Sequence, residues 1–437
     1  MYELRAFRGR NTKRMGMDKV SVSQQWHERL LNVMPWGSST CSKAPTLLPE
    51  EPAVIVKGKG CRVWDADGNE YIDFRNGLGP VTLGYRFPEV DGAIREQLEN
   101  GILFGQPHPL EAEVAEMLCG RIPCAEQARF LKTGGEAIAA TIRIARKVTG
   151  RDHIVQIGYN GWLNALSAGG PALPGREAAP SVPGVPACLS ALHHTATWND
   201  IDKLRALFDE LDGQIAAVVI AADYADMAAG AEFYPAVREL TRKRGALLIF
   251  DEIVTGFRVA IGGVQQYFGV VPDLAVFSKG IANGMPLSAY VGTKDVMSAC
   301  DRGGAVISST FGGETLSLAA AKATMGVYDR CDVIGHLWKH GEKLWSGVNR
   351  LFDRYGLPLE WKGFWPCPAL TVKPGAEASV RDKFFRAAYK NGVSLYNVSY
   401  VNFSHKDSDI EETLVRLERA CSELSVAEVG GSAGGKP

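Results

Sequence analysis

Two short apolar segments in the middle of the chain are each followed by a polar side chain that could do chemistry. Residues 246–250 lead into Asp251, and residues 274–277 lead into Ser278 and Lys279. Apolar segments of this length are typical of strands buried on both faces of a parallel sheet. Ligands of open α/β sheets bind beyond the carboxyl ends of the strands, so Asp251 and Lys279 could reach one pocket.

An acid and a lysine at neighbouring strand ends suit catalysis with pyridoxal phosphate (PLP). A lysine amine can form a Schiff base with this cofactor. A buried carboxylate would keep the ring nitrogen protonated, because an opposite charge at contact favours the charged form by about 1–3 pKa units. An ordinary ion pair between Asp251 and Lys279 would account for the spacing equally well. Gly280, Gly284 and Pro286 follow closely, so the lysine is not expected in a long regular helix.

A glycine turn provides a second candidate site. Residues 130–131 are predicted to end a strand, Thr133-Gly134-Gly135 to form the turn, and a helix to follow until Gly150. The first N–H groups of a helix lack backbone partners and point outward, which favours phosphate. Alone, this turn is a weak indication of a phosphate site, but it becomes strong beside the lysine motif.

Long motifs around these residues resemble a known family. LLIFDEIVTGFR and PDLAVFSKGIANGMPLSAYVG are similar to the core of the class III aminotransferases, and closest in style to glutamate-1-semialdehyde aminomutase. The resemblance extends from about Trp36 to Leu417. It implies a fold-type I PLP-dependent α/β enzyme with a large, mainly parallel-sheet domain and a small α+β domain built from both chain ends. It also implies that Lys279 is the Schiff-base lysine and Asp251 the partner of the ring nitrogen.

The resemblance assigns further cofactor-binding residues. Ile253 and Val254 would line one face of the ring, and Tyr159 would stack on it. Thr133, Gly134 and Gly135 would hold the phosphate, although Gly135 stands where the family commonly has a threonine. Thr310 would reach the phosphate of a neighbouring subunit, which implies a homodimer with shared active sites. An alternative for the threonine is an N-cap of the helix expected from about Leu316.

The chain departs from the family at positions that bind substrate carboxylates or assist the cofactor. Asn160 replaces a histidine, so any role of an imidazole is lost. Ala221-Ala222 replaces Glu-Pro at the end of the strand expected at residues 214–221. Lys43, near Trp36, stands where the aminomutases have an arginine, and lysine offers a point charge instead of a bidentate fork. Lys43 and Trp36 are therefore candidate substrate residues of a pocket that does not read an α-amino-acid carboxylate.

Composition sets the remaining bounds. The chain has 437 residues, a net charge of −1 and nine cysteines without a CxxC pair. The charge predicts no nucleic-acid partner, and no apolar segment reaches the length of a membrane span. Scattered cysteines are typical of reduced thiols in a cytoplasmic protein. His336 and His340 are one helical turn apart, but without a third ligand they do not predict a metal site.

The domain boundaries follow from the resemblance and from the helical patterns. Residues 1–90 are expected to form an N-terminal segment and part of the small domain, and residues 91–326 the large PLP-binding domain. Residues 327–425 should complete the small domain, and residues 426–437 should form a disordered tail. Residues 62–74 are predicted to form a hairpin with its turn at Asp67-Gly68.

Three functions remain open from the sequence. The first is an aminotransferase that acts on an amino sugar or another natural-product amine or carbonyl compound. The second is an isomerase, either an aminomutase or an epimerase, in which the same lysine shuttles protons without net transfer. The third is a non-catalytic protein of the same fold, which the presence of both Lys279 and Asp251 argues against.

Overall fold

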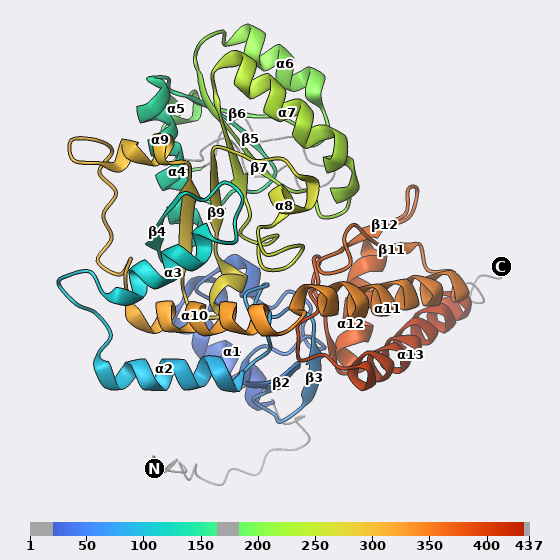
Figure 1. The fold of residues 1–437 in the computed structure, drawn as a ribbon. Helices are drawn as coiled ribbons and strands as arrows, with labels where there is room; N and C mark the ends of the chain where they lie inside the picture. The colour runs from blue at the N-terminus through green and yellow to red at the C-terminus, as the bar shows by residue number, and fades with distance from the viewer. Residues whose placement is uncertain (1–20, 164–182, 432–437) are drawn as a thin grey trace.

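The computed structural model describes residues 21–163 and 183–431 (Figure 1). The basic N-terminal segment and residues 432–437 lie outside the described residues. All nine cysteines fall within the described ranges and are free thiols. Within these ranges, no helix combines the length and the apolar composition that a membrane span requires.

A seven-stranded sheet forms the centre of the large domain. Its inner strands are buried along their length, which explains why they are continuous apolar segments in the sequence. β4 to β10 and β10 to β9 are antiparallel, and the remaining pairs are parallel, as the sequence predicted. Side by side, the strands are β4 (Gln127–Leu131), β10 (Ser288–Gly292), β9 (Leu274–Phe277), β8 (Leu247–Asp251), β7 (Ile215–Ala221), β5 (His153–Ile157) and β6 (His193–Thr195).

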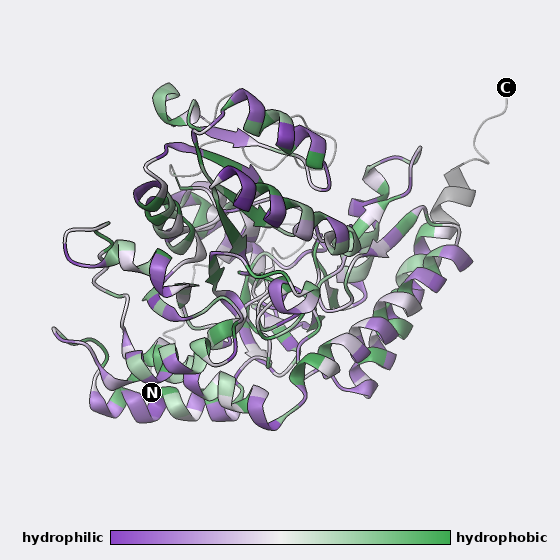
Figure 2. Cartoon of the chain, turned by 45° about the horizontal axis from the view of Figure 1, so that its top comes forward, coloured by the Kyte–Doolittle hydropathy of each residue, from purple (hydrophilic) through white to green (hydrophobic). Residues whose placement is uncertain are grey.

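Helices cover both faces of this sheet (Figure 1). Helix α4 (Gly134–Thr149) packs across β4, β10, β9, β8 and β7 and ends at Gly150, which has a left-handed conformation. Alternate residues of the same strands, such as Val218 and Phe250, point to a second core on the opposite face. Figure 2 shows the hydrophobic strands inside and the hydrophilic helix faces outside. The other helices of this part are α2 (Pro88–Asn100), α3 (Pro109–Cys119), α5 (Ala187–Ser190), α6 (Ile201–Glu210), α7 (Gly230–Arg244), α8 (Val264–Phe268), α9 (Lys294–Met297) and α10 (Thr315–Arg330).

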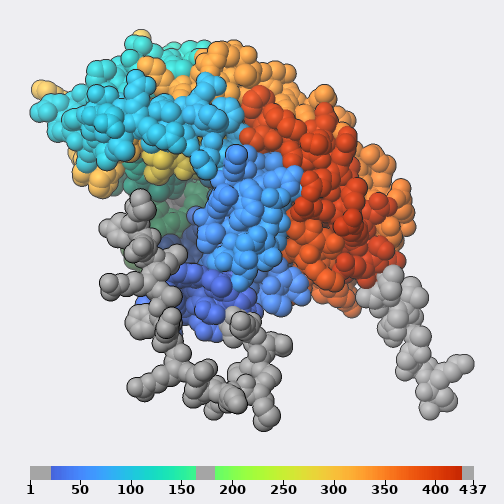
Figure 3. Space-filling model, turned by 90° about the horizontal axis from the view of Figure 1, so that it is seen from below, coloured from blue at the N-terminus to red at the C-terminus, as the bar shows by residue number. Residues whose placement is uncertain are grey.

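Both ends of the chain contribute to a smaller sheet. β2 (Arg62–Asp65) and β3 (Glu70–Asp73) form the predicted hairpin, β1 (Ile55–Lys59) extends it, and β13 (Val393–Ser394) joins it in parallel. Figure 3 shows the N-terminal residues, in blue, directly beside C-terminal residues in red. Arg62 joins them through ion pairs of 2.8 Å to Asp409 and 2.7 Å to Glu412.

The remaining elements complete the C-terminal part. They are β11 (Leu359–Lys362), β12 (Ala369–Val372), α11 (Val333–Arg354), α12 (Ser379–Lys390) and α13 (Asp407–Gly431), with α1 (Val22–Val33) near the start of the chain. Helix α13 continues past residue 425, where the sequence analysis placed the start of a disordered tail. Short 3-10 turns that matter for the site are η1 (Pro35–Gly37), η2 (Cys41–Lys43) and η5 (Lys279–Ala282).

Candidate active site

The carboxyl ends of β7, β8 and β9 bring the predicted acid and lysine together. Asp251 is the last residue of β8, and in register it lies between Ala221 of β7 and Val276 of β9. Lys279 begins η5 two residues after β9 ends. The two side chains are close enough that each charge alters the pKa of the other group. The structure thus brings the two side chains close together, while their roles toward a cofactor stay predictions.

Asp251 is a buried carboxylate with two hydrogen-bond donors. Its Oδ1 accepts from the Ile253 N–H at 3.0 Å, and its Oδ2 accepts from Asn160 Nδ2 at 3.3 Å. Burial raises the pKa of Asp251 to about 6, and the two hydrogen bonds and Lys279 oppose this shift. A cationic ligand beside Asp251 would relieve the cost of its buried charge.

Asn160 is a functional residue that the sequence reasoning missed. Its side chain is fully buried and its amide donates a hydrogen bond to Asp251. Its Oδ1 has no hydrogen-bond partner among the described residues. The signal was its place beside Tyr159 at the end of β5, a strand that pairs with β7. Asn160 thus places a hydrogen-bond donor beside the acid although it carries no imidazole.

Lys279 is held in an unusual backbone conformation. Its φ of 46° lies in the left-handed region, which side-chain-bearing residues seldom adopt and which marks strain at functional sites. Neighbouring bonds fix the turn: Ser278 Oγ donates to the Leu287 carbonyl at 2.8 Å, and Thr82 Oγ1 donates to the Gly280 carbonyl at 3.3 Å. Burial lowers the pKa of the Lys279 amine to about 8, Asp251 opposes this effect, and Arg258 adds to it.

The glycine turn before α4 has the features of an anion site. Thr133 is the N-cap, and its hydroxyl is hydrogen-bonded with Glu136 in a capping box. The helix's own backbone bonds begin with the Ala137 N–H, so those of Gly134 and Gly135 precede them. A Cβ at Gly134 would overlap Ile253 Cδ1, and this collision favours glycine at the turn. These features fit a phosphate at the N-terminus of a 16-residue helix.

The residues predicted to contact the cofactor ring differ in exposure. Val254 is buried, whereas Tyr159 is 58% exposed and forms part of the rim. Partial burial raises the pKa of Tyr159, and Asp251 and Cys41 raise it further, so both lie near its hydroxyl. The segment that carries η2 therefore reaches the rim of the site.

The two candidate substrate residues lie on that segment. Trp36 has a positive φ of 65° and is 64% exposed, and Lys43 is also exposed. At the end of β7, Ala221 and Ala222 are buried and bring no carboxylate. The structure thus places Lys43 and Trp36 outside the buried part of the site that holds Asp251.

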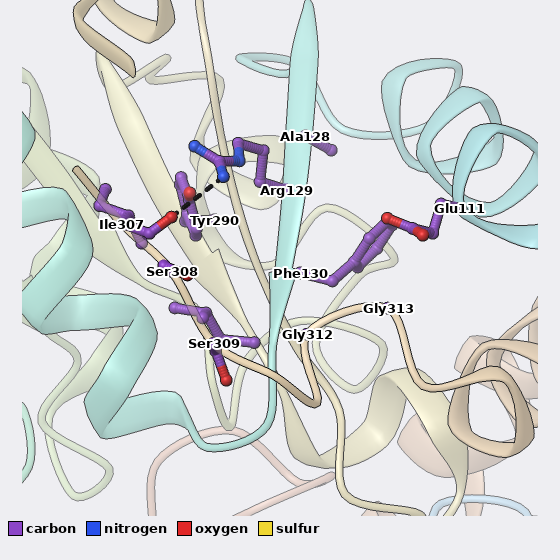
Figure 4. A pocket seen from close by; sticks show the side chains of 11 residues that line it. Glu111, Ala128, Arg129, Phe130, Tyr290, Ile307, Ser308, Ser309, Gly312 and Gly313 are labelled. Atoms are coloured by element: carbon purple, nitrogen blue, oxygen red, sulfur yellow. Dashed lines mark hydrogen bonds between the residues drawn. The ribbon is translucent and has the colours of Figure 1, made fainter. Parts of the chain in front are cut away.

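Thr310 lies in the exposed loop that precedes α10. Figure 4 shows the hollow beside this loop, where Arg129 Nη2 donates to the Ile307 carbonyl at 3.1 Å. The alternative role of the threonine as an N-cap is wrong, because Glu314 caps α10 by accepting from the Leu316 and Ser317 N–H groups. Thr310 is therefore presented at the surface, where another molecule can meet it.

The described residues contain no group of three or more side chains that could hold a metal ion. His336 and His340 stack on each other with ring centroids 3.8 Å apart. Burial lowers the pKa of His336 to about 4. They form part of the packing between α11 and the C-terminal residues, where His336 also meets the ring of Phe403.

Comparisons with known proteins place the chain in a family. Residues 47–419 match the family model described as aminotransferase class-III. The glutamate-1-semialdehyde 2,1-aminomutase of Persephonella marina is 33% identical over 394 residues, covering 86% of this chain and 92% of that protein. The FumI protein of Sphingopyxis sp. MTA144, solved as its PLP internal aldimine form, has a TM-score of 0.84 at 28% identity, covering 95% and 98% of the two chains. A β-phenylalanine aminotransferase of Variovorax paradoxus has a TM-score of 0.80 at 26% identity, covering 92% and 94%.

The chain belongs to the class III aminotransferase family, and it has the fold-type I architecture of PLP-dependent transferases. It is a PLP-dependent aminotransferase or aminomutase. The buried carboxylate, the strained lysine and the open helix N-terminus fit the ring nitrogen, the aldehyde and the phosphate of this cofactor.

Proposed function

We propose that the enzyme is an aminotransferase for an amino sugar or another bulky natural-product amine or carbonyl compound. The observation that carries this proposal is the end of β7, where Ala221 lies beside Asp251 in register and supplies no carboxylate. Among the candidate substrate residues, the only cation is Lys43, an exposed point charge. A pocket of this kind favours a substrate held by its skeleton over one held by an α-carboxylate.

Each residue has a role that follows from its surroundings. Bound PLP acts as an electron sink for the carbon that carries the amino group. Asp251 pairs with the ring nitrogen, and Asn160 helps to keep Asp251 ionised by donating to it. Gly134 and Gly135 hold the phosphate, with Thr133 beside them, while Val254 and Tyr159 contact the ring. The Lys279 amine, with a pKa of about 8, can accept and return a proton near neutral pH.

The alternative is an isomerase, and one observation favours it. The curated relatives from Persephonella marina and Aquifex aeolicus, at 33% and 32% identity, are both glutamate-1-semialdehyde 2,1-aminomutases. An aminomutase or epimerase would use the same lysine to move protons, but the nitrogen would stay on one molecule. The aminotransferase proposal predicts the opposite fate for the nitrogen.

The fate of a labelled nitrogen decides between them. A panel of ¹⁵N-labelled amines is incubated with the holoenzyme and a keto acceptor in deuterated water. The masses of the products are then measured by mass spectrometry. Transfer of ¹⁵N to the acceptor supports the aminotransferase. Retention of ¹⁵N in the same molecule, with deuterium at the adjacent carbon, supports the isomerase.

We also infer that two copies form a homodimer in which Thr310 of one copy reaches the phosphate held by the other. This inference is supported by the exposure of Thr310 and by exposed apolar residues near its loop. Phe311 is 56% exposed. Ile102, Leu103 and Phe104, which follow α2, are 43%, 40% and 47% exposed. Helix α2 packs on α10, the helix that follows the Thr310 loop. Apolar side chains gathered in this way are typical of an interface.

A further inference from the structure

Arg258 is a buried cation without an anionic partner. It is 1% exposed, and none of the ion pairs of the described residues includes it. Its Nη2 donates to the Gly79 carbonyl, and its Nε donates to the Val254 carbonyl at 3.2 Å. Its Nη1 has no hydrogen-bond partner in the described part of the chain.

Such a residue is costly to keep. An unpaired buried charge destabilises a fold by several kcal/mol, and an apolar side chain of similar size would pack at less cost. The ring of Tyr400, 4.5 Å from the guanidinium carbon, offsets part of this cost through a cation–π contact. The two backbone hydrogen bonds do not need a full positive charge. The positive charge of Arg258 is therefore more than these two hydrogen bonds require.

Arg258 is connected to Lys279 through Gly79. Gly79, whose carbonyl Arg258 holds, has a φ of 104°, and a Cβ there would lie 3.2 Å from Tyr400 Cζ and 3.5 Å from Lys279 Cδ. The Gly79 backbone thus fits between the tyrosine ring and the aliphatic part of the lysine. Asn76 Nδ2 fixes the other side by donating to the Tyr400 carbonyl at 2.9 Å.

We propose that Arg258 is a positioning residue that holds Gly79 against Lys279 and supplies a positive charge that favours the unprotonated form of the Lys279 amine. The proposal rests on the proposed function, in which Lys279 is the lysine that reacts with the cofactor. Only the unprotonated amine has a lone pair that can attack an aldehyde or accept a proton. An uncompensated guanidinium next to it favours that form.

Among the groups of the described residues that face Lys279, Arg258 is the one whose charge favours the unprotonated amine. Asp251 from β8 is an opposite charge and favours the protonated amine, whereas Arg258 lowers the pKa of Lys279 in addition to burial. The buried thiol of Cys367, from the loop before β12, also faces the lysine, but burial raises its pKa to about 12, so it is neutral near pH 7. Tyr400 is neutral as well, because burial raises its pKa.

The test measures the protonation of Lys279 in the apoprotein. Trace acetylation is followed by peptide mass spectrometry, and the rate at Lys279 is plotted against pH. Arg258→Met and Arg258→Gln remove the charge and are expected to move the inflection upward by about one pH unit. Arg258→Lys keeps the charge and should leave the inflection near its wild-type value. Circular dichroism establishes which variants fold, and the glutamine variant serves if the methionine variant does not.

Arg151→Met is the matched control. Arg151 also donates to two backbone carbonyls, those of Ile215 at 3.1 Å and Arg244 at 2.9 Å, but it lies at the opposite end of the strands from Lys279. This control should not move the inflection. An unchanged inflection in a folded neutral variant overturns the proposal, as does an equal shift in Arg258→Lys.

Positioning is tested separately by cofactor uptake. The lysine variant loses at least part of the bonding to Gly79 and should incorporate PLP more slowly, as measured by borohydride fixation at Lys279. Uptake at the wild-type rate would contradict the positioning role. Because acetylation uses the apoprotein, its outcome does not depend on whether the enzyme is an aminotransferase. Borohydride fixation at another lysine would refute the proposed function without changing the result at Arg258.

Discussion

The two sides of the active site differ in how they are built. The side that holds Asp251, Lys279 and the glycine turn consists of strand ends and a helix N-terminus, and Asp251 is 8% exposed. The side that carries Trp36, Lys43 and the Tyr159 rim consists of short turns, and Trp36 is 64% exposed.

This difference predicts that the strand side serves mainly the chemistry, and that the loop side contributes to substrate choice. Groups that act on a cofactor must be held at fixed positions, and packed strands and helices provide that precision. Groups that select a substrate lie in loops, where sequence changes cost little stability. The departure from the family pattern at Lys43 lies on the loop side. The departure at Ala221-Ala222 lies on the strand side and does not disturb Asp251. Variants on the first side should therefore abolish catalysis, and variants on the second should alter its selectivity.

The largest effect is expected at Lys279. Lys279→Ala removes the amine that we propose attaches the cofactor and moves the proton, so turnover should fall to the limit of detection. In the wild-type enzyme, borohydride should fix PLP to the peptide that contains Lys279. Lys147→Ala, an exposed change on α4, is the control and should remain active. Cofactor fixed to another peptide would contradict this assignment.

Asp251→Asn should have the next largest effect. The amide cannot pair with a protonated ring nitrogen, so the electron sink weakens and turnover should fall by several orders of magnitude. PLP should still bind, because the phosphate turn and Lys279 are intact, and absorption spectra would show this. Near-normal activity in the variant would mean that Asp251 does not contact the ring nitrogen.

The same carboxylate predicts a pH dependence of stability in the apoprotein. The pKa of Asp251 is about 6 in the folded protein and 3.8 in its ordinary state, so the folded form holds the proton more tightly. Its contribution is fully present below about pH 4 and is lost as pH rises to about 6. Relative to Asp251→Asn, wild-type apoprotein should lose up to about 3 kcal/mol over this range. Denaturant unfolding of both proteins at pH 4 and pH 7 measures the difference, and parallel curves would exclude it.

The strand side could be predicted from the sequence because its signals are local. Buried parallel strands are unbroken apolar segments, and the turn at Gly134 has the composition of a helix start. The bond from Asn160 to Asp251 could not be predicted, because it joins β5 to β8 across β7 and depends on sheet order. Arg258 gave no signal either, since its burial and its missing anion are properties of packing.

The loop side was less predictable for a related reason. The sequence analysis offered a threonine as an alternative N-cap of α10, but Glu314 is the N-cap. Its carboxylate accepts from two N–H groups and also pairs with Lys132 at 2.8 Å. The position of η2 near Tyr159 follows from tertiary contacts that no local pattern encodes.

A smaller effect is expected at Thr310. In the proposed shared site, Thr310→Ala would remove one hydroxyl from a phosphate held mainly by the partner's turn. PLP affinity should then fall about tenfold, the loss of one charge-assisted hydrogen bond. Ser308→Ala, in the same exposed loop, is the control. Equilibrium dialysis and sedimentation would report the affinity and the dimer together. A monomer with unchanged affinity in both variants would contradict the shared site.

The smallest effect is expected at Lys43, and it tests the comparison most directly. Because its ammonium is exposed, replacement by alanine should weaken any carboxylate-bearing donor only about two- to fivefold, within the range of an exposed ion pair. We expect the wild-type enzyme to use glutamate poorly. A bidentate guanidinium should do more than a point charge, so Lys43→Arg should improve the use of glutamate. Both variants should leave turnover of an uncharged amine unchanged, because Asp251 and Lys279 are untouched. The measurement is kcat/KM for glutamate and for the best uncharged amine in all three proteins. Equal losses for both donors would show that Lys43 supports the chemistry as well as the selectivity, and rapid wild-type turnover with glutamate would show that another residue binds the carboxylate.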